Sequence, residues 1–399
     1  MKRALVLLLV IAACKDDGPA ESYGFVATLG DDTVSVEQVT RSPHLLTSEA
    51  VDRFPLVRMR HTAIDLADVG KLTGMVMKVR TPSGKTPAER ERTVVAEFTA
   101  DSVRISITDS AGVTRRNFRT GGALTVPHIE MLYSVIELEI ASAMRLSAAA
   151  GKPRTDSIPF RQFYPDRDIG PRFVLHGGWV HPTAGDSVVL RHDWLSGSGD
   201  VTIDSAGRMQ TYSGMRSTYK VAVRRITDVP DIEAIGARFA AAEQKAGAAQ
   251  LSVRDTARGT IGSANITIDY GRPLARGRTL LGNVIAFDRV WRTGANAATQ
   301  FTTSAPITIG GLAVPAGTYT LWTVPHSATN VELIVNSQSG QWGTEYSSAR
   351  DLGTVKLQTD SATTAVEKFT MSVVLARQGR GALVLEWGTF RWSVGVVGR

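Results

Sequence analysis

The feature that most constrains this fold is the alternation of apolar and polar residues in many short runs. Residues 33–39, 72–79 and 103–108 each place every second side chain on an apolar side, and the side chains of a strand point alternately to opposite faces of a sheet. Turn-forming residues separate the runs, as at residues 30–32 and 109–112. Evenly spaced runs of this kind predict a mainly β fold, built on an antiparallel sheet with one solvent-exposed face.

Two segments break this period and predict helices. Residues 129–149 are rich in Ala, Leu, Met and Glu at helical spacing, and a Gly-Lys-Pro sequence follows them. Residues 231–246 form the second predicted helix, with Asp231 as its N-cap and Gly247 as its stop. A polar stretch comes next. We therefore expect an amino-terminal domain at residues 24–247, an antiparallel sheet with one or two helices.

Residues 251–399 return to strands and turns. Gly310 and Gly311 join two short alternating runs, and paired glycines accept the positive φ values that a type I′ hairpin turn requires. Pro315 and Gly317 occupy the second and fourth positions of a type I turn. About eight short strands in this part of the chain predict an antiparallel β-sandwich as the carboxy-terminal domain.

The amino terminus has the pattern of an export signal. Lys2 and Arg3 precede an apolar run at residues 4–12, which is too short to span a bilayer. The run ends in Ile-Ala-Ala followed by Cys14, which resembles the lipobox of bacterial lipoproteins. We expect residues 1–13 to be a signal peptide, Cys14 to carry lipid and residues 14–23 to be a tether. The predicted location is the cell envelope, on the outer membrane facing the periplasm.

The charge and cysteine content exclude several classes of protein. The formal charge is +7, and removal of Lys2 and Arg3 with the signal leaves 7 − 2 = +5. No long basic run and no zinc-finger, helix-turn-helix or RNA-binding signature occurs, so nucleic acid is not expected as a partner. The single cysteine, Cys14, excludes disulfides within the chain and metal sites rich in cysteine.

Several separated motifs in the carboxy-terminal part occur together in one known family. The motifs are Gly271-Arg272-Pro273, Trp291-Arg292-Thr293-Gly294, Val314-Pro315-Ala316-Gly317 and Gln341-Trp342-Gly343. From residue 251 to the end, the chain resembles the bacterial domain-of-unknown-function family 2911. The resemblance implies no activity, because none is assigned to that family, and residues 23–250 resemble no family.

The strongest candidate site also lies in this part. Five arginines fall within residues 272–292, and an indole and two amides join them through the family motifs. Guanidinium forks and amides around an indole suit a carboxylate, a phosphate or a sugar. The predicted ligand-binding residues are Arg272, Arg278, Trp291, Arg292, Asn296, Gln341 and Trp342. The alternative is structural: Trp291 would then anchor the core, and Arg292 would cap loop carbonyls.

The sequence contains no recognised catalytic motif. His176 and His181 are five residues apart, which puts them on opposite faces of a strand, so no metal site is expected from them. The sequence has no Gly-x-Ser-x-Gly elbow, Walker loop, His-Glu-x-x-His or dinucleotide fingerprint. We therefore expect no catalytic residue and no cofactor.

These observations favour an envelope lipoprotein that binds rather than catalyses. Its partners would be the membrane, through lipid on Cys14, and an anionic or polyhydroxylated envelope ligand or a partner protein. Two alternatives stay open. One is an envelope glycan hydrolase with an unpatterned carboxylate pair. The other is a lipid carrier, in which a curved half-barrel covered by the helix at residues 129–149 would hold an acyl chain.

Overall fold

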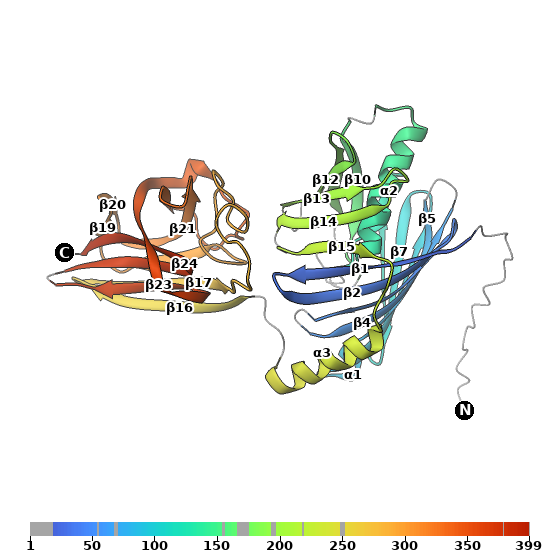
Figure 1. The fold of residues 1–399 in the computed structure, drawn as a ribbon, viewed down its shortest axis with the longest axis horizontal. Helices are drawn as coiled ribbons and strands as arrows, with labels where there is room; N and C mark the ends of the chain where they lie inside the picture. Colours follow the sequence, from blue (N-terminus) through green and yellow to red (C-terminus); the bar gives the residue numbers. More distant parts are fainter. Residues whose placement is uncertain are drawn as a thin grey trace.

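A computed structural model describes residues 19–53, 56–67, 71–153, 156–165, 175–192, 197–217, 219–247, 252–377 and 379–398. The predicted signal peptide and Cys14 lie outside the described residues. The structure is mainly β, with antiparallel sheets in both the amino-terminal and the carboxy-terminal region, as predicted (Figure 1). No helix among the described residues is long and apolar enough to cross a membrane.

The first sheet has 15 strands, and the first and the last of them along the chain are neighbours in the middle of the sheet. Its strands are β1 (Glu21–Leu29), β2 (Asp32–Arg41), β3 (Leu45–Asp52), β4 (Arg58–Leu66), β5 (Leu72–Arg80), β6 (Glu91–Phe98), β7 (Ser102–Asp109), β8 (Gly112–Arg119), β9 (Thr125–Pro127), β10 (Ile158–Phe163), β11 (His176–Pro182), β12 (Ser187–His192), β13 (Gly197–Ile203), β14 (Met209–Arg216) and β15 (Ala222–Ile226). The chain runs outward from β1 to β8, and β9 to β15 return from the other edge until β15 pairs with β1. β1 begins at Glu21, within the segment predicted as tether.

The crossover between the two halves places a helix against this sheet. β9 and β10 form a parallel pair, unlike the antiparallel pairs of the other strands. Parallel neighbours need a long connection, which is usually a helix that packs on one face. Here the connection is α2 (Tyr133–Ala149). The helix starts four residues later than predicted because Met131 has a positive φ of 62°, which is not helical.

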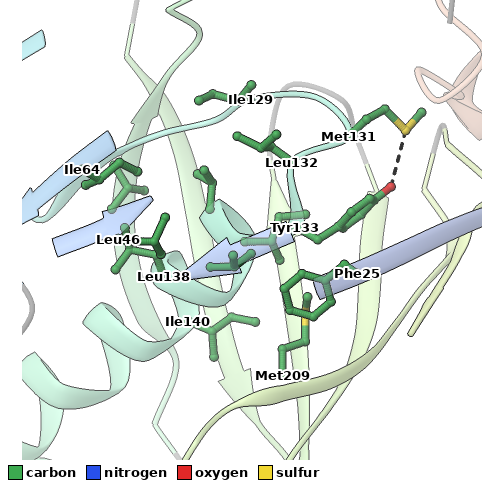
Figure 2. Packing of buried hydrophobic residues seen from close by; sticks show 14 of the residues in the cluster. Phe25, Leu46, Ile64, Ile129, Met131, Leu132, Tyr133, Leu138, Ile140 and Met209 are labelled. Carbon is green, nitrogen blue, oxygen red and sulfur yellow. Dashed lines mark hydrogen bonds between the residues drawn. The ribbon is translucent and has the colours of Figure 1, made fainter. Parts of the chain in front are cut away.

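Helix α2 lies inside the curve of the first sheet and is buried on nearly all sides over its first turns (Figure 1). Leu138 and Ile140 pack in one cluster with Phe25 of β1 and Leu46 of β3, and Figure 2 shows these contacts. Tyr133 at the start of the helix belongs to the same cluster. The largest hydrophobic core of this region therefore includes both the concave face of the sheet and the helix that it surrounds.

Helix α3 (Ile232–Ala246) covers the opposite face of the same sheet, near β2 to β4 (Figure 1). Its N-cap is Asp231, whose side chain accepts a hydrogen bond from the Ala234 amide at 3.0 Å, and its C-cap is Gly247, as predicted. Ile235 and Phe239 pack there against Val36 of β2. A short helix, α1 (Pro87–Arg90), with a capping box at Thr86 and Glu89, connects β5 to β6.

The second sheet contains nine strands and folds over on itself. The strands are β16 (Ser252–Ile261), β17 (Ala264–Pro273), β18 (Thr299–Thr303), β19 (Ile307–Ile309), β20 (Leu312–Val314), β21 (Gly317–Pro325), β22 (Val331–Asn336), β23 (Asp351–Leu375) and β24 (Arg380–Gly398), with a 3-10 turn at Ser348–Arg350. The pairing of β23 with β24 is interrupted by irregularities between Ser361 and Thr370. The Tyr270 hydroxyl of β17 reaches across to the backbone of Met371 in β23. The predicted β-sandwich therefore has an interior between the halves of one bent sheet.

The glycine hairpin of this region has the predicted geometry. Gly310 and Gly311 connect β19 to β20 with φ values of 54° and 94°. The two regions touch beside the turn between β1 and β2. The Asp31 amide donates to the Arg276 carbonyl at 3.3 Å, and the Arg276 guanidinium pairs with Asp32.

Candidate functional site

The arginines predicted to bind a ligand are partly committed to the fold. Arg272 on β17 uses all of its donor nitrogens: Nε bonds the Phe369 carbonyl at 3.0 Å, and the terminal nitrogens bond Asp255 and Thr370, each at 2.8 Å. Arg278 donates to the carbonyls of Ala275 and Leu274 at 3.0 and 2.5 Å. Both guanidinium groups hold strand ends and loops in place, which is the structural alternative considered above.

Trp291 is part of the apolar core. It is 8% exposed, and it stacks on Trp387 with ring centroids 5.9 Å apart and an interplanar angle of 11°. Phe369 and Trp392 contact its edges. An indole in this position has no free face to offer to a ligand.

The remaining four predicted residues do come together, around Gly343. The Asn296 carbonyl accepts a hydrogen bond from the Gly343 amide at 3.0 Å, and the stem of Arg292 lies where a Cβ of Gly343 would be. Gln341 is buried and donates to Thr320 at 3.0 Å, whereas Trp342 is 38% exposed. These side chains therefore form a loop cluster with a buried cation and an exposed indole.

Arg292 in this cluster is a buried cation. It is 9% exposed, and among the described residues its guanidinium has no hydrogen-bond or ion-pair partner. Burial lowers the pKa of Arg292 to about 10. Lys220, in the turn before β15, is close enough that Arg292 and Arg278 add to the effect of burial, and the pKa of Lys220 falls to about 7. The contact between the two regions thus gathers three cations.

A cavity lined by described residues lies beside α2 and was not anticipated from the sequence. Its volume is about 670 Å³, within the range typical of small-molecule sites. The apolar part of its wall comes from Ala141 and Met144 of α2, Ile158 of β10 and Ile203 of β13. Charged side chains from the ends of β1, β2 and α2 and from the turn after β13 surround this wall.

An ion-pair network closes one side of this cavity. Glu137 of α2, whose side chain is 2% exposed, accepts hydrogen bonds from Tyr23 at 2.5 Å, from Arg225 at 2.8 Å and from the Met209 amide at 2.8 Å. Arg41 lies 3.5 Å from the same carboxylate. Burial, together with the charge of Glu137, raises the pKa of Tyr23, so this phenol stays a donor. The carboxylate is therefore satisfied by the fold itself.

Two cations at the cavity do not pair with a carboxylate of the described residues. Arg145 bonds only the Ala141 carbonyl of its own helix, at 3.3 Å, and neither Arg145 nor Lys152 forms an ion pair with a described residue. Burial and the neighbouring Arg41 lower the pKa of Arg145. A long chain could lie along the apolar wall while an acidic group meets Arg145 and Lys152. The acidic Asp186, also at the cavity, reduces but does not cancel their charge.

The sequence contained one signal that could have located this region. Glu137 and Glu139 interrupt an otherwise apolar helical segment, and buried carboxylates occur where they are paired or bind a ligand. Arg145 and Lys152 carry no comparable signal, because basic residues at a helix end usually only stabilise the last turn.

Comparison with known families gives a match in the second region only. Residues 252–396 match the model of the family described as protein of unknown function (DUF2911), as the sequence motifs predicted. No curated protein matches the chain.

Two solved structures show weak similarity to this chain. A DUF1089 family protein from Pseudomonas aeruginosa is 14% identical, with 47% of this chain and 92% of that chain covered and a TM-score of 0.35. The polysaccharide lyase Uly1 is 6% identical, with 93% and 89% covered and a TM-score of 0.13. Both TM-scores are too low to support an assignment of fold or function.

Proposed function

We propose that this chain is an envelope lipoprotein whose amino-terminal region binds an amphiphile, an acyl chain with an anionic head group. The observation that carries the proposal is the 670 Å³ cavity beside α2, which combines an apolar wall with two cations that form no ion pair with described residues. The curved sheet around the helix corresponds to the lipid-carrier alternative, and the cations correspond to the anionic ligand expected from the sequence.

The acyl chain and the head group would make separate contributions to the binding affinity. Each buried methylene of an acyl chain contributes about 0.8 kcal/mol, so a chain along Met144, Ile158 and Ile203 would supply most of the affinity. A carboxylate or phosphate near Arg145 and Lys152 would contribute less, because Arg145 is only partly desolvated and water still screens its charge. The head group would instead set the orientation of the ligand.

A cavity-filling substitution tests this proposal. Ala141→Trp places an indole in the cavity, and Ala242→Trp places the same indole on the exposed side of α3 as a control. With a dansyl fatty acid as the probe, we expect Ala141→Trp to weaken binding at least about tenfold, or about 1.4 kcal/mol. The control variant should bind like the wild type. Equal binding by both variants, or no binding by the wild type, would contradict the proposal.

The head-group preference has its own test. Arg145→Glu should weaken binding of the dansyl fatty acid and leave binding of an uncharged monoacylglycerol unchanged, measured by competition. If both ligands lose affinity equally, the cations have no role in recognition.

The anchoring part of the proposal is supported by the Ile-Ala-Ala-Cys sequence that ends at Cys14. We expect Cys14→Ser to abolish labelling with a radioactive fatty acid and to release the protein from the membrane fraction. A variant that still fractionates with membranes would contradict lipidation.

A further inference from the structure

A second polar group on α2 has different surroundings from the acids at the cavity. Glu139 is fully buried, and its carboxylate lies beside the imidazoles of His128 and His192. His128 follows β9, Glu139 lies in the second turn of α2 and His192 ends β12. One ligand atom from each residue lies within 4.8 Å of the others. Three elements that are distant in sequence therefore bring two imidazoles and a carboxylate to one point.

The distances fit a shared ion better than direct hydrogen bonds. His128 Nδ1 is 3.4 Å from one Glu139 oxygen, and His192 Nε2 is 3.3 Å from the other. Hydrogen bonds between nitrogen and oxygen cluster at about 2.9–3.0 Å. Zinc binds nitrogen and oxygen at about 2.0–2.1 Å, and two donors on a tetrahedral ion are then about 3.3–3.4 Å apart. The two histidine-to-glutamate separations match this ligand-to-ligand distance, and all three ligand atoms lie within 4.8 Å of one another.

The charge balance also favours a cation. Glu137 on the same helix is paired with two arginines, whereas Glu139 forms an ion pair with no Lys or Arg among the described residues. A buried carboxylate is stable when it is paired or when it coordinates a metal. A divalent ion would supply the positive charge that no Lys or Arg among the described residues brings to Glu139.

An open side adjoins the three residues. A small cavity of about 50 Å³ is lined by His128 and His192 together with Tyr212, Tyr219 and Glu130. This volume can hold a water molecule, which needs about 10–15 Å³ on the same measure. Two histidines, one carboxylate and one open position form the donor set of a zinc site that keeps a place for water or substrate.

We propose that His128, Glu139 and His192 bind one zinc ion, with its fourth position facing the small cavity. The proposal does not depend on amphiphile binding, because the 670 Å³ cavity is lined by none of these three residues. No sequence pattern predicts this site. The spacing of His176 and His181 does not point to it, because His128 lies in another segment and Glu139 lies on a helix.

A titration of the full chain, stripped with a chelator, tests this site. By calorimetry we expect one zinc ion per chain, bound more tightly than about 1 μM. His128→Gln and His192→Gln should each weaken binding at least about 100-fold. The matched control is His326→Gln. His326 also lies beside two carboxylates, at 2.7 Å from Asp288 and 3.5 Å from Glu332, but it is exposed and each ring nitrogen faces a different acid.

A second measurement covers the case in which a histidine variant does not fold. Cobalt added to the stripped wild-type protein should give the strong visible absorption of a tetrahedral site, and zinc should displace it stoichiometrically. Zinc binding weaker than about 1 μM, an octahedral cobalt spectrum, or equal losses in His192→Gln and His326→Gln would each overturn the proposal. In those cases the three residues form a buried hydrogen-bond network only.

Discussion

The two regions of this molecule bury different kinds of side chain. The first sheet surrounds a helix and encloses carboxylates, namely Glu37, Glu137 and Glu139, each of which is at most 1% exposed. The second sheet folds over an interior of aromatic rings, with Trp291 stacked on Trp387 and Phe369 against both. Buried polar groups require partners, whereas stacked rings fill space completely. The cavity of about 670 Å³ accordingly lies among the polar and apolar groups of the first region.

The cationic residues show the same contrast. In the second region, Arg272 and Arg278 donate to backbone carbonyls and stabilise loops. In the first region, Arg145 and Lys152 stand at a cavity without an ion-pair partner among the described residues. Arg272 and Arg278 thus form structural hydrogen bonds, whereas Arg145 and Lys152 are the groups for which we propose a ligand.

The largest effect is expected at the start of α2. Glu37 of β2 accepts hydrogen bonds from the amides of Tyr133 and Ser134, at 2.8 and 3.0 Å, and from the Ser134 hydroxyl. Glu37→Ala would leave these buried donors without a partner, so we expect a loss of about 3–5 kcal/mol in the free energy of unfolding. Urea unfolding followed by circular dichroism measures it.

The control for this experiment is Glu49→Ala on the neighbouring strand β3, where the side chain is exposed. We expect the control to change stability by less than about 0.5 kcal/mol. A similarly small change for Glu37→Ala would mean that the buried Glu37 carboxylate does not stabilise the fold of the first region.

The next effect concerns the contact between the regions and depends on pH. The pKa of Lys220 falls to about 7 in the folded protein, chiefly because of burial, from 10.5 in the unfolded chain. The unfolded state therefore binds more protons between pH 7 and 10.5, and the free energy of unfolding rises with pH across this window. Lys220→Met removes the cost of burying the charge. We expect it to raise stability by about 1–3 kcal/mol at pH 7 and below.

The measurement is the difference in unfolding free energy between the wild type and Lys220→Met at pH 6, 7 and 9. The advantage of the variant should shrink as the pH rises, because the wild-type amine loses its proton in the folded state. Lys152→Met, at an exposed position, should show no such dependence. A constant difference across the pH range would mean that Lys220 is fully solvated.

The sequence predicted local structure better than the contents of the interior. Local residues determine the hairpin at Gly310 and Gly311 and the capped start of the helix after Asp231. Their positions could therefore be predicted from the sequence alone. The two predicted helices and the antiparallel sheets follow from periodicity. In contrast, the pairing of β1 with β15 joins distant segments, and no local pattern encodes it.

The candidate sites show which parts of the structure the sequence could not predict. Arg292, Asn296 and Trp342 were predicted to converge, and the structure brings them together around Gly343. Arg272 and Trp291 are held elsewhere, because a motif indicates which residues matter but not whether they face a ligand or the core. The cavity and the group of His128, Glu139 and His192 exist only because the crossover helix α2 enters the curved sheet.

A smaller effect tests whether Arg292 stabilises its loop. A buried guanidinium without partners costs desolvation energy, and replacing such a charge by an apolar side chain of similar length is often neutral or stabilising. We expect Arg292→Met to keep the packing of the stem over Gly343 and to change the free energy of unfolding by between 0 and about +1 kcal/mol. Thermal unfolding compared with Arg272→Met, which would lose three hydrogen bonds, measures the contrast. A marked loss in Arg292→Met would show that Arg292 caps loop carbonyls.

An effect confined to one turn isolates the local turn chemistry of the second region. Gly311 has a φ of 94°, and a Cβ added there would meet nothing within 4 Å, so Gly311→Ala changes only the backbone preference. Alanine in this conformation should cost about 1 kcal/mol. Gly395→Ala on β24 is the matched control, because a Cβ there also meets nothing and its φ is not positive. That change should be neutral or stabilise by about 0.5 kcal/mol, because alanine loses less entropy than glycine in a strand. Equal melting temperatures for the two variants would show that the hairpin tolerates another turn type, and the second region would then owe its order to its aromatic core alone.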